Sequence, residues 1–264
     1  MQKKLIYLFL LLFSWYSGAQ AEDLQRGSMG VVLMHGKGGQ PSRNIATLAQ
    51  TLEAEGVKVV TPVMAWSGSR GQPFNYDKTY DMALREIDGA IAKLRARGAT
   101  KIIVAGQSLG ANAALAFAAR KPGGISGVIM LAPGHTPERM RSADILSAQA
   151  EARQMVAAGK GSQRREFPDL NVGQSFMVTG TYAGWYSYFD PLGAANMPAN
   201  AARLRAMPIL YVVGRSDPLT RMGRAYIYEQ AKPHPKSRYV EVNADHFDTP
   251  HHARSLVLDW LKSL

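Results

Sequence analysis

The 264-residue chain predicts an α/β fold with a doubly wound, mostly parallel sheet of about six strands. Two observations predict it: short apolar runs alternate with segments of helical periodicity, and turn-forming residues follow most of the runs. The segments that we expect to form strands cover residues 29–34, 57–63, 101–105, 127–132, 208–213 and 238–242. The first of them is continuously apolar, as expected of a strand buried on both faces. The segments that we expect to form helices cover about 42–55, 77–97, 109–120, 221–230 and 253–264. In the helix at 77–97, Met82 belongs to the predicted apolar stripe.

The alternation stops between the fourth and fifth runs, at about 136–207. This interval holds a polar helical segment at 142–157, then a loop rich in Gly, Lys and Arg, then an aromatic group. The aromatic group consists of Trp185, Tyr186, Tyr188 and Phe189. So long an interval is unusual for a plain loop and predicts a cap over the active edge of the sheet. The aromatic group either lines a substrate pocket or forms the core of the cap itself.

The first 21 residues have the features of a secretory signal peptide. Lys3 and Lys4 precede the apolar run 5–13, and Ala19-Gln20-Ala21 is a small-residue cleavage site. The apolar run is short for a bilayer, which favours cleavage over an uncleaved anchor. The chain has no cysteine, which excludes a lipid-anchored lipoprotein. We therefore expect a single domain, 22–264, that is periplasmic or secreted and has no stable membrane anchor.

The charge of this mature domain is positive but dispersed. Without the two lysines of the first segment, 29 basic residues face 20 acidic ones, an excess of +9. The basic residues are scattered and form no run with interleaved aromatics, so we expect no nucleic-acid partner. A third hypothesis, a cationic protein that binds membranes or polymers, is supported only by this net charge.

The segment Gly106-Gln107-Ser108-Leu109-Gly110 lies between a predicted strand and a predicted helix. A G-x-S-x-G in this context forms a sharp turn that lifts the serine hydroxyl out of the sheet. Bulky residues at the flanking positions would collide with the adjoining strand and helix. We interpret Ser108 as a nucleophile; a purely structural turn is the alternative.

Four candidate residues follow ends of predicted strands: Lys37, Ser108, Asp217 and His246. Ligands of such sheets bind beyond the carboxyl ends of the strands. A serine hydroxyl needs a base, a histidine such as His246 can take and return that proton, and Asp217 can fix the imidazole tautomer. The backbone N–H groups of Lys37 and Leu109 are candidates for the oxyanion hole.

These motifs resemble the α/β-hydrolase-fold serine hydrolases of the small bacterial esterase, lipase and dienelactone-hydrolase-like kind. The resemblance rests on His35-Gly36-Lys37-Gly38-Gly39, the G-x-S-x-G, Gly214-Arg215-Ser216-Asp217-Pro218 and His246-Phe247. It implies an acyl-enzyme on Ser108, a small-molecule acyl substrate and no cofactor. A carboxylic ester is the expected substrate, and a thioester, lactone or small amide suits the same triad.

Two departures from the family pattern lead to further expectations. Few residues precede the first strand, which suggests a trimmed sheet. Lys37 stands where many relatives carry an apolar or aromatic residue, and its charge would favour an acidic acyl group. The alternative to an enzyme is a catalytically silent α/β-hydrolase that serves as an accessory or binding protein of the cell envelope.

Other polar residues are weaker candidates. Asp245 is an alternative acid for His246, but adjacent residues at a strand end rarely face each other. Asp190 precedes a proline and is interpreted as a turn residue, and His35 as a structural residue of its loop. His246, His251 and His252 lack the spacing of a known metal motif, so we expect no metal.

Overall fold

The structure is a computed structural model that describes residues 28–68, 74–121 and 123–264. The predicted signal peptide, 1–21, lies outside the described residues. Within the described ranges, no helix is both long and apolar enough to cross a membrane.

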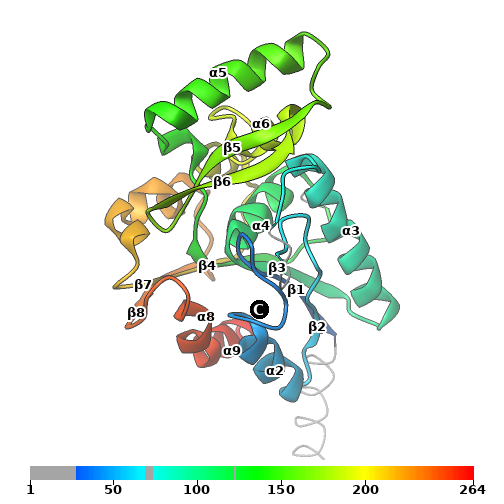
Figure 1. Cartoon of the computed structure of the whole chain (residues 1–264). Helices are drawn as coiled ribbons and strands as arrows, with labels where there is room; N and C mark the ends of the chain where they lie inside the picture. The colour runs from blue at the N-terminus through cyan, green and yellow to red at the C-terminus, as the bar shows by residue number, and fades with distance from the viewer. Residues whose placement is uncertain (1–27, 69–73, 122) are drawn as a thin grey trace, which may run out of the picture.

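A six-stranded parallel sheet forms the centre of the molecule (Figure 1), which confirms the predicted fold class. The strand order is β2-β1-β3-β4-β7-β8, and each neighbouring pair is parallel. The strands are β1 (Met29–Met34), β2 (Lys58–Val60), β3 (Lys101–Ser108), β4 (Gly127–Pro133), β7 (Ile209–Gly214) and β8 (Arg238–Val242). The second strand is shorter than predicted, because Pro62 cannot donate to a ladder and Val63 is exposed.

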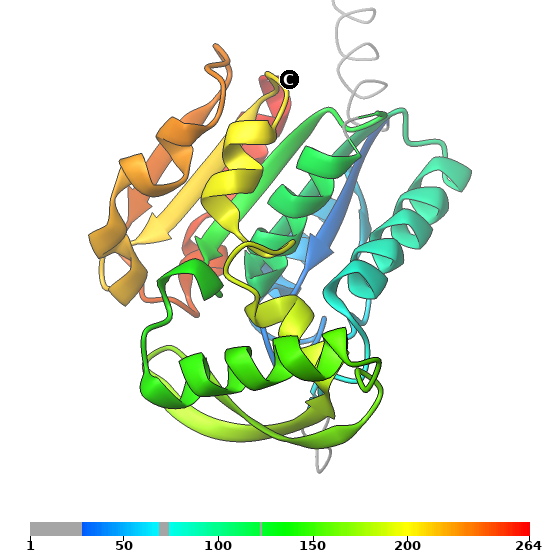
Figure 2. The same cartoon turned by 90° about the horizontal axis from the view of Figure 1, so that it is seen from above.

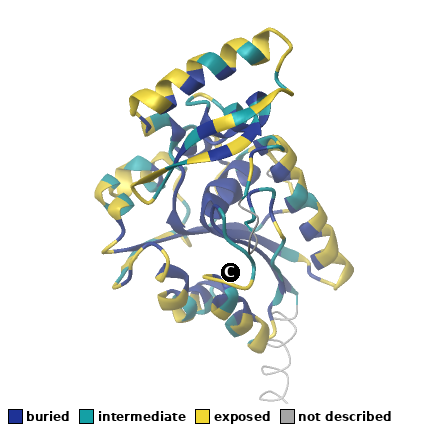
Figure 3. Ribbon diagram, in the orientation of Figure 1, coloured by how far each residue is buried: buried dark blue, intermediate teal, exposed yellow. Residues whose placement is uncertain are grey.

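Helices cover both faces of the sheet, so its central strands, β1, β3, β4 and β7, are apolar on both sides. One face carries α2 (Ala46–Ala54), α8 (Thr249–His252) and α9 (Arg254–Lys262), and the other α3 (Tyr80–Ala96) and α4 (Leu109–Arg120). Alternate residues of β3 illustrate the two layers: Ile103 packs in the first, Ile102 and Val104 in the second. Figure 3 shows the resulting band of buried residues through the sheet and α4.

The segment between β4 and β7 contains the cap. It comprises η1 (Pro137–Arg139), α5 (Ala143–Ala157), the antiparallel hairpin β5 (Arg164–Asn171) and β6 (Gln174–Thr181), and α6 (Tyr182–Phe189). The strands of the sheet point toward this cap (Figure 2), which therefore lies beyond their carboxyl ends. The chain then returns to β7 through α7 (Met197–Arg203), which packs on α4.

Tyr76 joins the cap to the rest of the fold through its backbone. Its N–H donates to Thr179 O at 3.0 Å, and its carbonyl accepts from Thr181 N–H at 3.1 Å. The loop that precedes α3 thus forms a single parallel β-bridge to β6, between Tyr76 and Gly180. The cap is therefore hydrogen-bonded to the α/β core as well as packed against it.

Several local predictions were wrong. The helix expected at 221–230 is a series of 3₁₀ turns, η2 (Pro218–Met222), η3 (Arg224–Tyr226) and η4 (Tyr228–Gln230), broken at Gly223, whose φ is 66°. The last helix is split at Ala253 into α8 and α9. Met82 is 41% exposed and lies outside the apolar stripe of α3. The hairpin β5–β6 occupies a region where a loop was expected.

Candidate active site

Ser108 sits in a strained turn between β3 and α4. Its φ is 56° and its ψ −119°, a conformation that non-glycine residues rarely adopt. The flanking glycines make the turn possible by close approach: a Cβ on Gly106 would lie 2.2 Å from the carbonyl carbon of Gly110. A Cβ on Gly110 would in turn lie 2.5 Å from Met34 O. Both motif glycines are therefore required by packing.

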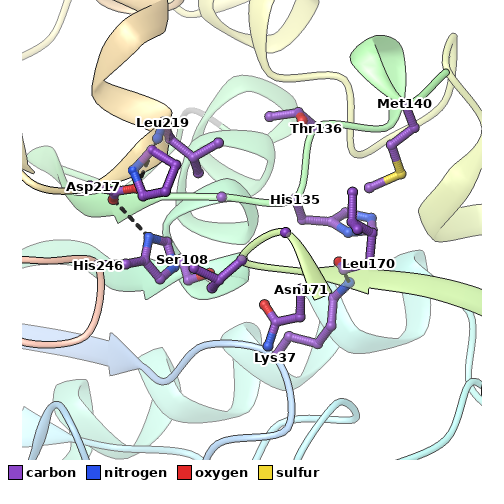
Figure 4. Close-up of a pocket in the computed structure, with 14 residues that line it drawn as sticks. Lys37, Ser108, His135, Thr136, Met140, Leu170, Asn171, Asp217, Leu219 and His246 are labelled. Carbon is purple, nitrogen blue, oxygen red and sulfur yellow. Dashed lines mark hydrogen bonds and ion pairs between the residues drawn. The ribbon is translucent and has the colours of Figure 1, made fainter. Parts of the chain in front are cut away.

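Asp217 and His246 form a buried pair beside this turn. His246 Nδ1 lies 2.7 Å from Asp217 Oδ2, and the exposed fractions of the two side chains are 4% and 0% (Figure 4). Leu219 N–H donates to the other carboxylate oxygen at 2.9 Å. Because the carboxylate accepts from Nδ1, the imidazole carries its proton there and Nε2 has a free lone pair.

The loops that carry this pair are tied to each other and to the serine turn. Ser216 N–H donates to Ala244 O at 3.0 Å, which joins the two loops. Gln107 Nε2 donates to His246 O at 3.1 Å, which joins the histidine loop to the residue before Ser108. Gln107, the residue before Ser108 in the G-x-S-x-G, thus holds the loop that carries His246.

Ser108 Oγ and the His246 ring are close. A Cβ on Gly134 would lie 2.7 Å from Ser108 Oγ and 3.4 Å from His246 Cε1. Ser108 Oγ donates no hydrogen bond to any residue that the structure describes. In serine hydrolases, the hydrogen bond from the serine to the histidine is often long without substrate and shortens when substrate binds.

The two candidate oxyanion donors have N–H groups that are free to bind a ligand. Leu109 is the first residue of α4, so its N–H has no carbonyl within the helix to bind. The N–H of Lys37 donates to no atom in the described part of the chain. Backbone hydrogen bonds hold the loop around Lys37: Gly38 N–H donates to Trp66 O at 2.9 Å and Gly39 N–H to Gly36 O at 3.0 Å.

His35 has the structural role that the sequence indicated. Its Nδ1 lies 2.8 Å from Gly36 O, and its Nε2 accepts from Met64 N–H at 3.3 Å. Nδ1 is therefore the protonated nitrogen. Burial lowers the pKa of His35, which keeps the ring neutral and these bonds in place.

The side chain of Lys37 does not offer a free positive charge. Its Nζ lies 2.6 Å from Asp169 Oδ1, and the exposed fractions of the two side chains are 2% and 0%. A carboxylate of the cap neutralises the charge on which the expected preference for an acidic acyl group rested, so the structure gives that expectation no support. Asp169 was not a candidate in the sequence: it comes from β5, 132 residues away.

Two cavities meet at Ser108. The first has a volume of about 100 Å³ and is lined on its apolar side by Met140, Leu170, Val172 and Leu219, with Asp217 and His246 at its end (Figure 4). The second, of about 290 Å³, is polar and is lined by the 35–39 loop together with Gln40, Arg43, Asn44, Gln107, Asn171 and Phe247. Lys37, Ser108 and Asn171 line both, so they mark the junction.

His135 is a site residue that the sequence interpretation missed. It lines the first cavity with φ at 63°. Its Nε2 donates to Tyr188 O at 2.8 Å, while its buried Nδ1 has no partner in the described chain. Burial lowers the pKa of His135 well below its usual value, and the charge of Lys37 adds to the effect. It follows the end of β4, so the strand-end criterion applied to the other candidates would have found it.

The aromatic group forms the core of the cap. Trp185 stacks on Phe189 at a centroid distance of 4.3 Å and on Phe167 at 5.0 Å, and all three are fully buried. Tyr188 is also buried, and Tyr186 packs against the same cluster. None of the four predicted residues is among those that line the two cavities. A cap of this size needs a core of its own, and these rings supply it.

The weaker candidates have other roles. Asp245 Oδ1 accepts from the N–H groups of Phe247 and Asp248, both at 2.8 Å, and does not contact the His246 ring. Asp190 caps a turn by accepting from Leu192 N–H at 3.0 Å. Among the described residues, no group of three His, Cys, Asp or Glu side chains is arranged to hold a metal ion.

Residues 31–259 match the Alpha/beta hydrolase family. The chain belongs to this family. A search of curated proteins finds no significant match in sequence.

Solved structures of hydrolases share the fold. One is of the metagenome-derived lipolytic enzymes LipS and LipT, with a TM-score of 0.66 at 17% identity over 90% of this chain and 94% of that one. The monoacylglycerol lipase of Paleococcus ferrophilus gives 0.63 at 21% identity over 89% and 94%. Est1E of Butyrivibrio proteoclasticus, solved with ferulic acid bound, gives 0.58 at 19% identity over 89% and 87%.

Proposed function

We propose that this α/β hydrolase is a serine hydrolase that cleaves a carboxylic ester through an acyl-enzyme on Ser108. The observation that carries the proposal is the buried Asp217–His246 pair, which opens onto the same cavity as the strained Ser108. A thioester, lactone or small amide would react by the same steps.

In the proposed reaction, His246 Nε2 takes the proton of Ser108 as Oγ attacks the substrate carbonyl. Asp217 holds the ring and stabilises the imidazolium that forms. The N–H groups of Lys37 and Leu109 bind the oxyanion, and the helix dipole of α4 favours the same charge. The imidazolium then protonates the leaving alcohol, and water, activated by His246, hydrolyses the acyl-enzyme.

The two cavities suggest how the substrate is divided. The smaller, apolar one suits a short acyl chain, and the larger, polar one suits an alcohol that carries hydroxyl or anionic groups. Arg43 is the cation in the polar cavity without an ion-pair partner among the described residues, since Lys37 is paired with Asp169. The neighbours named as lipolytic enzymes and as a monoacylglycerol lipase fit an ester substrate.

We further propose that the protein is exported, because Lys3, Lys4, the apolar run 5–13 and Ala19-Gln20-Ala21 have the order of a signal peptide. Expression with a C-terminal tag, followed by fractionation and N-terminal sequencing of the product, tests it. A periplasmic or secreted product that starts at Glu22 would support export, and an intact cytoplasmic chain would refute it.

The activity is tested with residues 22–264 and the Ser108→Ala variant. Both are incubated with a fluorophosphonate probe and with p-nitrophenyl esters of graded chain length. We expect labelling and turnover in the first protein only, with the highest kcat/KM for short acyl chains. Absence of labelling in folded, unmodified protein would refute the hydrolase and favour a silent accessory protein of the same fold.

A further inference from the structure

The buried pair of Lys37 and Asp169 connects the site to the cap. Asp169 Oδ1 accepts from Lys37 Nζ and from Leu170 N–H, both at 2.6 Å. Its Oδ2 accepts from Tyr76 OH at 2.7 Å. The carboxylate is therefore fully satisfied by three donors, which a buried charge requires.

The ammonium group of Lys37 also has further contacts besides Asp169. Its Nζ also donates to Leu170 O at 3.2 Å and lies 5.5 Å from the centroid of the Phe189 ring. The ammonium group thus contacts β5 and α6 of the cap, while its backbone belongs to the 35–39 loop. One side chain spans the boundary between the cap and the α/β core.

Stability alone does not account for this arrangement. Two apolar side chains of similar volume would commonly stabilise a fold as well as a buried ion pair does. What this pair adds is a short charge-assisted hydrogen bond, 2.6 Å long, which holds its two partners at a defined distance. Here one partner is Lys37, the proposed oxyanion donor. The other lies at the end of β5, where Leu170 and Asn171 line the cavities.

We propose that the Lys37–Asp169 ion pair is a positioning device. It fixes the backbone N–H of Lys37, the proposed oxyanion donor, relative to the part of the cavity wall that the cap contributes. The inference rests on the proposed esterase function. Lys37 contacts substrate only through its backbone, and Asp169 and the ammonium group act by holding that backbone in place. Displacement of a catalytic group by about 1 Å lowers a rate by about 100-fold.

The test compares Lys37→Met, Asp169→Asn and the double variant Lys37→Met/Asp169→Leu with the unmodified protein. Each single change leaves one buried charge without its partner and is expected to lower Tm. The double change removes both charges and is expected to recover most of the Tm. It is not expected to recover kcat, which should stay about 10- to 100-fold below that of the unmodified protein on p-nitrophenyl butyrate.

A second measurement separates the oxyanion donor from general loss of structure. A trifluoromethyl ketone forms a tetrahedral adduct with serine and depends on the oxyanion hole, whereas butyrate, a product, does not form one. In the double variant we expect the affinity for the ketone to fall in parallel with kcat/KM, while the affinity for butyrate changes by less than about threefold.

Glu151→Gln provides the control. Glu151 pairs with Arg165 at 2.8 Å, also within the cap, but the side chains are 42% and 37% exposed. This variant should retain kcat, ketone affinity and Tm.

The possible outcomes distinguish the two proposals. Failure of the unmodified protein to react with the fluorophosphonate refutes the esterase itself. A labelled, active protein whose double variant keeps kcat within twofold refutes the positioning role alone. Loss of ketone and butyrate affinity to the same degree also refutes it, because such a loss indicates collapse of the cavity.

Discussion

Asp217 and Asp169 are both fully buried and both paired with a basic side chain, yet they come from different parts of the fold. Asp217 follows a strand of the sheet and binds the imidazole of His246. Asp169 lies in the cap hairpin and binds the ammonium group of Lys37. An imidazole has a second nitrogen with a lone pair that can take a proton, whereas an ammonium group has only donors. The first pair is suited to move a proton, and the second only to hold a position.

The largest effect should come from Asp217→Asn. An asparagine keeps the shape of the aspartate but not its charge, and its NH₂ group can face His246 Nδ1. The imidazole then takes the wrong tautomer, so kcat should fall by about 10⁴-fold. Tm should change little, because the cavity remains filled. Turnover of p-nitrophenyl butyrate and a thermal melt measure both quantities. A loss of kcat below tenfold would mean that another group orients the histidine.

Tyr76→Phe should act on stability more than on turnover. It removes the donor to Asp169 Oδ2, a bond to a buried charge, and should cost about 1.5–3 kcal/mol of the free energy of unfolding. Tyr80→Phe is the matched control: Tyr80 is equally buried but its OH donates at 2.5 Å to the neutral Asn112, so about 0.5–1.5 kcal/mol is expected. Urea unfolding measures both, and equal losses would mean that the charge of Asp169 adds nothing to the bond.

His135 lies beside both pairs and should make stability depend on pH. Its pKa is lowered by burial and by Lys37, so below about pH 6.5 the unfolded chain takes up a proton that the folded chain does not. Stability should therefore fall as the pH drops below 6.5, by up to about 1.4 kcal/mol per pH unit for this residue. His35 contributes in the same direction, since its pKa is also lowered by burial.

His135→Asn removes this contribution, and asparagine tolerates the left-handed backbone at φ 63°. Urea unfolding at pH 7 and pH 5 should give a smaller difference for the variant than for the unmodified protein. An unchanged difference would show that His135 is protonated as readily in the folded state as in the unfolded one.

The smallest effect should come from Asp245→Asn, which changes the residue before His246. The side chain is exposed, and asparagine can still accept from the N–H groups of Phe247 and Asp248. We expect kcat within twofold and stability within about 0.5 kcal/mol of the unmodified protein. A large loss of kcat here, with Asp217→Asn mild, would reverse the assignment of the acid.

The same comparison shows what a single sequence can predict. Ser108 ends β3, Asp217 follows β7 and His246 follows β8, and parallel strands bring their carboxyl ends to one edge, so local pattern was enough to group them. Asp169 follows Pro168 in a polar stretch that has no strand pattern, and its partner is 132 residues away. Nothing local in the sequence indicates that contact.

The fold shows the same division. The sheet was predicted because strands buried on both faces are continuous apolar runs. The cap hairpin was missed because Pro168 and the charged residues 164–166 argue against a strand, and pairing with β6 overrides that preference. The series of 3₁₀ turns after Asp217 was predicted as one helix, although Gly223 interrupts it at a positive φ.

The position of α7 has a consequence for how the chain can change length. Because α7 packs on α4 and leads directly into β7, it serves as the crossover between two adjacent parallel strands. The cap therefore occupies only the connection from β4 to α7. Closing a longer connection costs little, about 0.6 kcal/mol for each doubling. Insertions, deletions or whole grafted hairpins between Thr136 and Asn196 would thus leave the register of the sheet unchanged, which makes this connection the natural place to exchange one lid for another.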